Sequence, residues 1–256
     1  MPSAVALMPK KKDLEMSKIK ISILTPSIRL GLLHINNQCL KKQVFKGFEW
    51  LIGSSFNPKM GTWVKDNFRG GYWSLNRIYN KMLKRAKGEL IVSYQDGIWI
   101  PNDALEHFYD WYTTKGPKWC VTGVGDLYSA LDERNKPIIS VWADPRKSGR
   151  EKNGDAYECY PVDWEANFAA APRKMFYDIG GFDEELDKFA GMDNVSIVER
   201  ADELGYRFWI DQSLECFGLK HNRRKNWNQQ HAMNGPYEQR KKELKMGGIW
   251  PTLNYL

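Results

Sequence analysis

The sequence predicts an α/β fold: one domain in which a mixed, mostly parallel central sheet is flanked by helices. The chain has 256 residues, and 42% of them are hydrophobic, which suffices for one large domain with an ordinary core. In its first half, short apolar runs alternate with helical patterns. The order strand, helix, strand, helix, strand is typical of a parallel sheet with right-handed crossovers.

Three strands are predicted in this first half. They are expected at residues 19–24, 48–53 and 90–92, where apolar residues alternate or form a short run. Helices are expected in three places: ending near Lys42, running from Tyr72 to a C-cap at Gly88, and starting from a cap at Asn102 or Asp103. Residues 54–71 are rich in Gly, Asn and Pro, which predicts a loop.

The second half is predicted to add shorter strands and one clear helix. The strands are expected at residues 119–125, 137–142, 206–210 and 214–219. The helix starts at Asp193 and is closed by Gly205. The charged segment 144–155 reads equally as a lid or as a solvated insertion.

The composition limits the possible partners and compartments. Lys and Arg outnumber Asp and Glu by 38 to 31, and the net charge of +7 favours an anionic partner. The four cysteines lie too far apart to indicate a zinc site or a disulfide framework. No apolar run approaches the roughly 18 residues of a membrane span, and the first 20 residues lack the apolar centre of a signal peptide. We therefore expect a cytoplasmic protein whose residues 1–17 form a flexible basic leader.

Two aspartates stand at positions where a substrate can be reached. Asp96 follows the predicted strand in ELIVSYQDGIWIP (89–101), and ligands of open α/β sheets gather outside the carboxyl ends of the strands. Asp193 opens the predicted helix of the second half. Both also have a purely structural interpretation, Asp96 as a turn residue and Asp193 as an N-cap.

Four stretches in the right order resemble the GT-A fold glycosyltransferases. The closest resemblance is to the inverting family 2 enzymes and their relatives with a galactosyltransferase-like C-terminal half. The stretches are ISILTPSIR (21–29), GYWSLNRIYNKMLKRAKGE (71–89), the Asp96 segment, and GGFDEEL (180–186) with FAGMDNVSIVERADELGYRF (189–208). This resemblance implies a nucleotide-binding half at 18–101, an acceptor and catalytic half at 102–221, and a basic tail or lid at 222–256.

The resemblance implies a metal-assisted transfer of a sugar from a UDP-linked donor to an acceptor hydroxyl, with inversion. Asp96 matches the second aspartate of the DxD motif, which holds the metal, whereas Tyr94 stands in place of the first. His221 matches the C-terminal histidine ligand, so Asp96 and His221 would hold Mn2+ or Mg2+. Asp193 matches the catalytic base, and Met192 replaces the glutamate before it.

The resemblance also assigns binding residues. The nucleotide-sugar pocket is expected to include Thr25, Pro26, Ser27, Arg29, Asp66, Arg69, Asn76, Tyr94, Gln95 and Asp96. Trp164 and Asn167 lie where relatives bind the acceptor, and Trp164 is expected to stack on a sugar face. Arg223, Arg224 and Lys225 either close over phosphate oxygens or form a solvated basic loop.

Two other functions stay open beside the glycosyltransferase. The missing acidic residues at positions 94 and 192 favour a degenerate GT-A module that binds a nucleotide or glycan without transfer. Nucleic-acid binding depends only on the net charge and on aromatic residues such as Trp227, so it is the least favoured.

Overall fold

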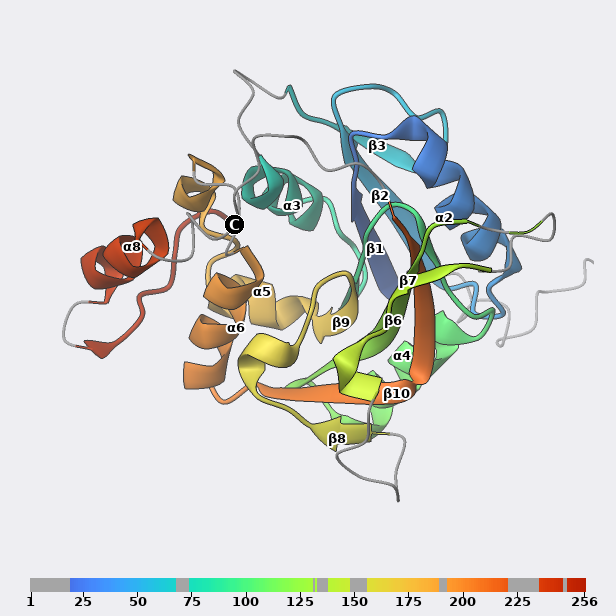
Figure 1. The fold of residues 1–256 in the computed structure, drawn as a ribbon. Helices are drawn as coiled ribbons and strands as arrows, with labels where there is room; N and C mark the ends of the chain where they lie inside the picture. The colour runs from blue at the N-terminus through green and yellow to red at the C-terminus, as the bar shows by residue number, and fades with distance from the viewer. Residues whose placement is uncertain are drawn as a thin grey trace, which may run out of the picture.

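The computed structural model describes residues 19–67, 74–130, 132, 138–147, 156–188, 193–220, 235–245 and 248–256, with the backbone alone at Asp193 (Figure 1). The helices are α2 (Leu30–Lys42), α3 (Leu75–Leu83), α4 (Ala104–Lys115), α5 (Arg173–Asp178), α6 (Asp193–Glu203) and α8 (Pro236–Leu244), and the 3-10 turns are η1 (Pro145–Lys147), η2 (Pro161–Asp163) and η3 (Glu184–Lys188). The strands are β1 (Ile21–Pro26), β2 (Phe48–Ser54), β3 (Thr62–Lys65), β4 (Leu90–Tyr94), β5 (Ile98–Trp99), β6 (Trp119–Tyr128), β7 (Ser140–Trp142), β8 (Ala156–Glu158), β9 (Phe168–Pro172) and β10 (Arg207–Leu219).

The strands form a single mixed sheet, which confirms the predicted fold class. Its order is β3-β2-β1-β4-β9-β6-β10-β5, with β7 on β6 and β8 on β10. Parallel pairs join β3, β2, β1 and β4, and another parallel pair joins β6 with β10. Strand β9 runs antiparallel between β4 and β6. The parallel strands therefore end at one edge of the sheet, and β9 begins at that same edge.

Each face of the sheet is covered by its own group of helices (Figure 1). Alternate strand residues point to opposite faces, so neighbours such as Ile23 and Leu24 belong to different clusters. Ile23 packs with residues of α2 and α4, including Leu33 and Phe108. Leu24 packs with residues of α3, α5 and α6, including Tyr79. The central strands are therefore buried on both faces of the sheet. Because neither face is exposed to water, these strands appear in the sequence as continuous apolar runs.

Several element predictions were wrong in detail. The expected loop at 54–71 contains β3, an edge strand whose residues are mostly exposed or half-buried and so carry a weak apolar signal. The two strands expected at 206–219 are one strand, β10, with a register shift between Ile210 and Glu215. Helix α3 ends at Leu83 rather than at Gly88. Gly88 instead packs against β1, where its N–H donates to Ser22 Oγ at 2.8 Å.

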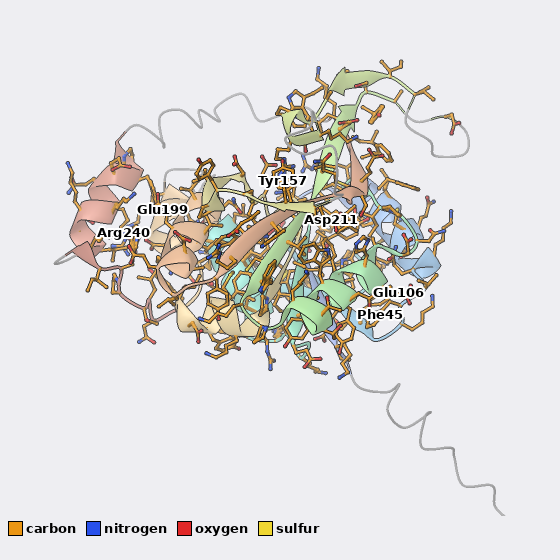
Figure 2. The ribbon with its side chains drawn as sticks, turned by 90° about the horizontal axis from the view of Figure 1, so that it is seen from below. Phe45, Glu106, Tyr157, Glu199, Asp211 and Arg240 are labelled. Carbon is orange, nitrogen blue, oxygen red and sulfur yellow. The ribbon has the colours of Figure 1, made fainter. Side chains whose placement is uncertain are left out.

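Within the segment 222–256, expected as a basic tail or lid, the described residues 235–245 and 248–256 pack against the rest of the structure. Helix α8 lies beside α6, where Tyr237 donates to Glu199 at 2.9 Å (Figures 1 and 2). Residues 248–256 then bind back to the core, since the Leu253 N–H donates to the Ile179 carbonyl at 3.1 Å. Gly180 allows this approach, because a Cβ there would lie 1.5 Å from the Leu253 carbonyl oxygen. In the described part of the chain, no helix has the length and apolar character that a membrane crossing requires.

Asp211 connects α4 to the register shift of β10. Its carboxylate accepts hydrogen bonds from Trp111 Nε1 at 2.6 Å and from Ser213, and it lies 3.0 Å from His107 Nε2. The hydrogen bond with Asp211 raises the pKa of His107 above its usual range, although partial burial opposes the shift. Burial alone would raise the pKa of Asp211, but its bonds with His107, Ser213 and Trp111 lower it.

This pair makes stability depend on pH. A histidine whose pKa is raised by folding stabilises the fold fully below its unfolded pKa, and this stabilisation is lost as pH rises through the folded pKa. His107→Gln should therefore lower the free energy of unfolding at about pH 5 and change it little at about pH 9. Urea unfolding at both pH values measures this. His34→Gln on α2 is the matched control, and an equal loss at both pH values would contradict the assignment.

Gly88→Ala should destabilise the fold. Its Cβ would lie 2.5 Å from backbone atoms of Ile21 and Ser22, so a central strand has to shift, at a cost of about 1–3 kcal/mol or more. Gly31→Ala in α2 is the control, because no atom lies within 4 Å of its new Cβ. It should stabilise by about 0.5–1 kcal/mol. Thermal unfolding compares the two, and similar values for both would show that Gly88 is not constrained by β1.

Candidate functional site

The candidate site lies at the sheet edge where β1, β2, β3 and β4 end. Ser27 follows β1, and Asp66 follows β3, where its N–H donates to the Ser54 carbonyl at 3.0 Å. Asp96 follows β4 by two residues. Strand β9 starts at this edge with Phe168, which pairs with Tyr94. The topology therefore gathers the ends of four parallel strands where open α/β sheets bind their ligands.

Asp96 is the centre of a compact ion-pair network. Its residue is 7% exposed, and both carboxylate oxygens are bonded. Arg29 donates from Nη2 to Oδ1 at 2.6 Å and from Nε to Oδ2 at 3.1 Å. Ser27 Oγ donates to Oδ2 at 2.6 Å. Ser27 lies just after β1 and Arg29 just before α2. The Arg29 guanidinium forms a bidentate ion pair with the Asp96 carboxylate, and Ser27 adds a third hydrogen bond.

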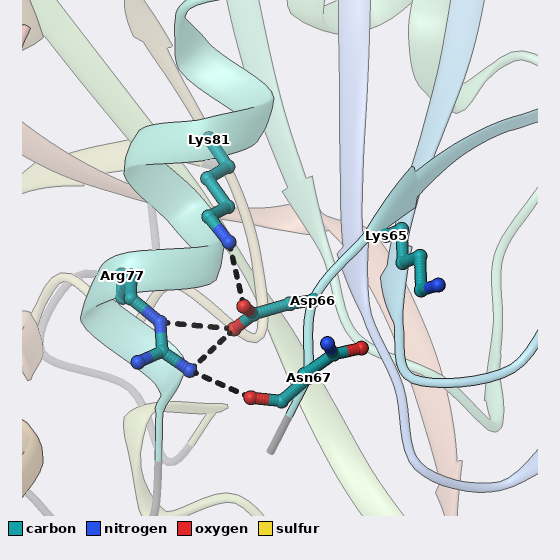
Figure 3. A pocket seen from close by; sticks show the side chains of 5 residues that line it. All are labelled: Lys65, Asp66, Asn67, Arg77 and Lys81. Atoms are coloured by element: carbon teal, nitrogen blue, oxygen red, sulfur yellow. Dashed lines mark hydrogen bonds and ion pairs between the residues drawn. The ribbon is translucent and has the colours of Figure 1, made fainter. Parts of the chain in front are cut away.

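A second ion-pair cluster surrounds Asp66 at the same edge (Figure 3). The Asp66 carboxylate is buried between two cations of α3: Arg77 Nη2 lies 3.0 Å from Oδ2, and Lys81 Nζ lies 2.7 Å from Oδ1. These residues line a cavity of about 360 Å³ together with Lys65 and Asn67. The cavity is polar and carries more positive than negative charge. Arg77 and Lys81 were not singled out in the sequence, although their helical spacing places both on one face of α3.

The opposite side of the edge holds a polar group that includes Asn167. The Gln95 N–H donates to the Asn167 carbonyl at 2.9 Å, and Asn167 Nδ2 donates to Glu165 Oε2 at 3.0 Å. Burial raises the pKa of Glu165, while Arg146, 3.7 Å away, opposes the shift. Glu165 is a further carboxylate at this edge, and no motif in the sequence singled it out.

Helix α6 begins beside this polar group. Asn194 accepts a hydrogen bond from the Ala166 N–H at 3.2 Å, and its side-chain amide donates to the Trp164 carbonyl. Because Asn167 bonds to Gln95, the start of α6 is joined through residues 164–167 to the turn that carries Asp96. The backbone of Asp193 is therefore placed near the candidate site, whereas its side chain lies outside the described atoms.

Two predicted ligand residues point into the core. Tyr94 is 1% exposed, and its hydroxyl donates to the Ile98 carbonyl at 2.6 Å. Trp164 is also 1% exposed and packs against Phe208, so it does not present a face to a sugar. These placements do not support direct ligand contact by either side chain. Both side chains fill apolar layers beside the sheet, as large aromatic residues usually do.

Three other predicted residues have structural partners. Thr25 is buried and accepts a hydrogen bond from Trp50 Nε1 at 2.8 Å, while the adjacent Pro26 ends β1 half-buried. Asn76 is buried at the start of α3 and bonds to Asp187 with its side-chain amide at 3.0 Å and its backbone N–H at 2.8 Å. Burial raises the pKa of Asp187 to about 6, although these donors oppose the shift.

The GGFDEEL block that contributed to the resemblance is held by buried polar side chains. Asn80 of α3 donates to the Phe182 carbonyl at 2.9 Å and accepts from its N–H at 2.8 Å. Arg200 of α6 donates to the carbonyls of Ile179 and Gly181 at 2.7 and 2.8 Å. This block therefore positions α6 against α3, and Asn80 is a structural residue that the sequence analysis did not select.

Several predicted site residues lie outside the described residues: Arg69, Met192, His221, Arg223, Arg224 and Lys225. The described chain approaches the site before this stretch, because the Leu219 N–H donates to the Gly97 carbonyl at 3.0 Å. Lys220 follows, with its N–H bonded to the Tyr128 carbonyl at 2.7 Å. The roles of His221 and the basic residues after it remain predictions.

The described residues do not fit a divalent cation at Asp96 in this arrangement. Among them, no three His, Cys, Asp or Glu side chains converge on a possible metal position. Both oxygens of Asp96 already accept hydrogen bonds from Arg29 and Ser27. A metal bound by Asp96 and His221 would share the Asp96 carboxylate with the Arg29 guanidinium, so two positive charges would lie close together and repel each other.

The core position of Tyr94 gives a test of the missing DxD aspartate. Tyr94→Asp should destabilise the fold by several kcal/mol, because it buries a carboxylate among apolar side chains instead of creating a metal ligand. Tyr94→Phe is the matched control and should cost about 1 kcal/mol, through loss of the bond to the Ile98 carbonyl. Urea unfolding measures both. A stable Tyr94→Asp protein that binds Mn2+ would refute this placement.

Comparison with solved structures identifies a similar fold. The chain is similar to the crystal structure of GalNAc-T7 with UDP, GalNAc and Mn2+, with a TM-score of 0.59 and 12% sequence identity. The similarity covers 82% of this chain and 45% of that protein, so this chain spans less than half of its length. No protein-family model and no curated protein sequence matches the chain. At this identity the similarity concerns the fold, which is a GT-A glycosyltransferase-like fold.

Proposed function

We propose that this chain transfers a sugar from a nucleoside diphosphate sugar, UDP-linked, to an acceptor hydroxyl. The observation that carries the proposal is the Asp96 network at the carboxyl edge of a GT-A-like sheet. The similar protein GalNAc-T7 was crystallised with UDP and GalNAc, which supports this ligand class by analogy of fold. A cytoplasmic location belongs to the same proposal.

The donor would lie along the ends of the parallel strands. Asp66 with Arg77 and Lys81 forms a polar cavity at the β3 end of the edge, suited to the hydroxyl and amide groups of a nucleoside. Ser27 and Arg29 lie further along the edge, beside Asp96. The anionic diphosphate is proposed to lie at Arg29, because a guanidinium binds phosphate oxygens in pairs.

The acceptor would bind on the side of Asn167 and the start of α6. In the proposed reaction the acceptor oxygen attacks the anomeric carbon, the bond to the diphosphate oxygen breaks, and Asp193 takes the acceptor proton. Attack from the face opposite the leaving group gives inversion. The anchoring of α6 by Asn194 supports this role, since it holds the Asp193 backbone near the Asp96 turn. Asn167 is proposed to contact the acceptor.

The leaving diphosphate carries developing negative charge and needs a positive partner. A divalent cation at Asp96 and His221, as the resemblance implies, would supply Lewis-acid chemistry to the leaving oxygen, but the pairing of Asp96 with Arg29 does not favour one there. Arg223, Arg224 and Lys225 are proposed to close over the phosphates from the following segment. Among the described residues, Arg29 is the cation bonded to Asp96.

A binding module without transfer is the second candidate. The observation that favours it is the paired state of Asp96, because the Arg29 guanidinium bound to this carboxylate would repel a metal cation placed there. This module would bind a nucleotide or a glycan without transfer, so the two candidates differ in turnover. An assay for release of nucleoside diphosphate from UDP-sugars, with and without acceptor, distinguishes them.

Asp193→Asn should reduce transfer by about 100- to 10,000-fold while leaving donor binding nearly unchanged, because it removes the proton acceptor but keeps the side-chain shape. The measurement is release of UDP from UDP-sugars, combined with calorimetric binding of UDP. Asp202→Asn, on the exposed side of the same helix, is the matched control.

Glu165→Gln tests a rival base, since the Glu165 carboxylate lies beside Asn167, on the side of the edge where the acceptor is proposed to bind. A large loss of turnover in Glu165→Gln, with normal turnover in Asp193→Asn, would show that Glu165 rather than Asp193 is the catalytic base. Turnover that is absent from the wild-type protein with every donor, together with normal UDP binding, would favour the binding module.

A further inference from the structure

Asp96, the carboxylate that the resemblance assigns to a metal, already forms an ion pair with the side chain of Arg29. Arg29 bonds to both oxygens of Asp96, at 2.6 and 3.1 Å, and the Asp96 side chain is 3% exposed. Removing the guanidinium would leave a buried, unpaired carboxylate, which is strongly unfavourable. The buried position of Asp96 therefore favours its ion pair with Arg29 over an unpaired carboxylate that could bind a metal cation.

Arg29 retains donors for a ligand. A guanidinium has five N–H groups, and Asp96 uses two of them, one on Nε and one on Nη2. Within the described part of the chain, no hydrogen bond uses the other three. The Arg29 side chain is 33% exposed, so part of the group faces solvent at the sheet edge. Two phosphate oxygens can be bound by such remaining N–H groups.

The surroundings of Arg29 also favour an anion. Arg29 immediately precedes α2, a helix of 13 residues with no acidic side chain in its first turn, so the positive end of the helix dipole lies at this point. Lys220 lies at the same edge, since the preceding residue, Leu219, bonds to the Gly97 carbonyl. Tyr94, which stands in place of the first aspartate, lies in the core and adds no negative charge.

We infer that Arg29, oriented by Asp96, binds the diphosphate of the donor in place of a divalent metal, so that nucleotide binding does not require one. Asp96 is then a positioning residue for the guanidinium rather than a metal ligand. This inference depends on the proposed function for the identity of the ligand, a nucleoside diphosphate.

The test is calorimetric binding of UDP to the full chain, once with Mn2+ and once with EDTA. The expected result is a dissociation constant that agrees within about twofold between the two conditions and that weakens about 10- to 100-fold in Arg29→Gln. Arg29→Lys should lie between, because it keeps the charge and loses the paired geometry. Arg207→Gln, at the start of β10 on the opposite edge, has the same charge change and should bind as the wild type does.

The opposite results overturn the inference. UDP binding that requires Mn2+, and that Arg29→Gln keeps or strengthens, would show that a metal takes Asp96 and that the arginine competes with it. No UDP binding in either condition would overturn both this inference and the donor assignment of the proposed function. UDP binding whose affinity is unchanged by EDTA, without any sugar transfer, would contradict the transferase proposal and support the role of Arg29.

Two measures keep the test decisive if Arg29→Gln does not fold. The wild-type comparison between Mn2+ and EDTA needs no variant. The double variant Arg29→Gln/Asp96→Asn removes both charges, so it leaves no unpaired carboxylate in the buried site. It should bind UDP as weakly as Arg29→Gln does, and its thermal unfolding reports whether it folds. Wild-type affinity in the folded double variant would also overturn the inference.

Discussion

The buried carboxylate of Asp96 is the constraint around which the candidate site is arranged. A carboxylate whose side chain is 3% exposed has lost most of its contact with water, so its burial is strongly unfavourable without a positive partner and hydrogen-bond donors. Arg29 and Ser27 supply both, and they come from the segment that links β1 to α2. The end of β1, the start of α2 and the turn after β4 are therefore held together by one charge and its partners.

The same edge is completed by segments that are distant in the sequence. Strand β9 is inserted antiparallel between β4 and β6, so residues 164–167 reach the turn of Asp96. Asn194 then fastens α6 to these residues, and the GGFDEEL block fixes α6 against α3 through Asn80 and Arg200. Helix α8 and the last residues add a further layer by packing on α6 and on Ile179–Gly181. The position of α6 is thus determined by contacts from three directions.

Part of this site could be predicted from the sequence. The apolar runs and helical spacings predicted the α/β fold, and the end of a predicted strand placed Asp96 at the carboxyl edge of the sheet. The resemblance assigned Ser27 and Arg29 to the same pocket, and the structure brings all three into contact. Tyr94 and Trp164 were assigned to ligands by their place in the resemblance, yet both side chains are buried. For Tyr94 the reason is that β4 is buried on both faces, so its sequence shows no alternation of polar and apolar residues that would indicate where the side chain points. No sequence pattern identified the other polar residues of the site, because single polar residues are common on any surface. These are Arg77, Lys81, Glu165 and Asn194.

The sequence by itself determined the class of fold, most of the order of strands and helices in the first half of the chain except for β3, and the presence of a carboxylate after β4. These properties follow from local patterns: the apolar period, turn residues and short motifs in order. Tertiary structure alone decided what that carboxylate contacts. Arg29 and Asp96 are 67 residues apart in the chain, and their pairing depends on β1 and β4 lying side by side, a long-range arrangement that local patterns do not encode. Asp96, which the resemblance matches to the second aspartate of a metal-binding motif, is in the folded chain the buried ion-pair partner of Arg29.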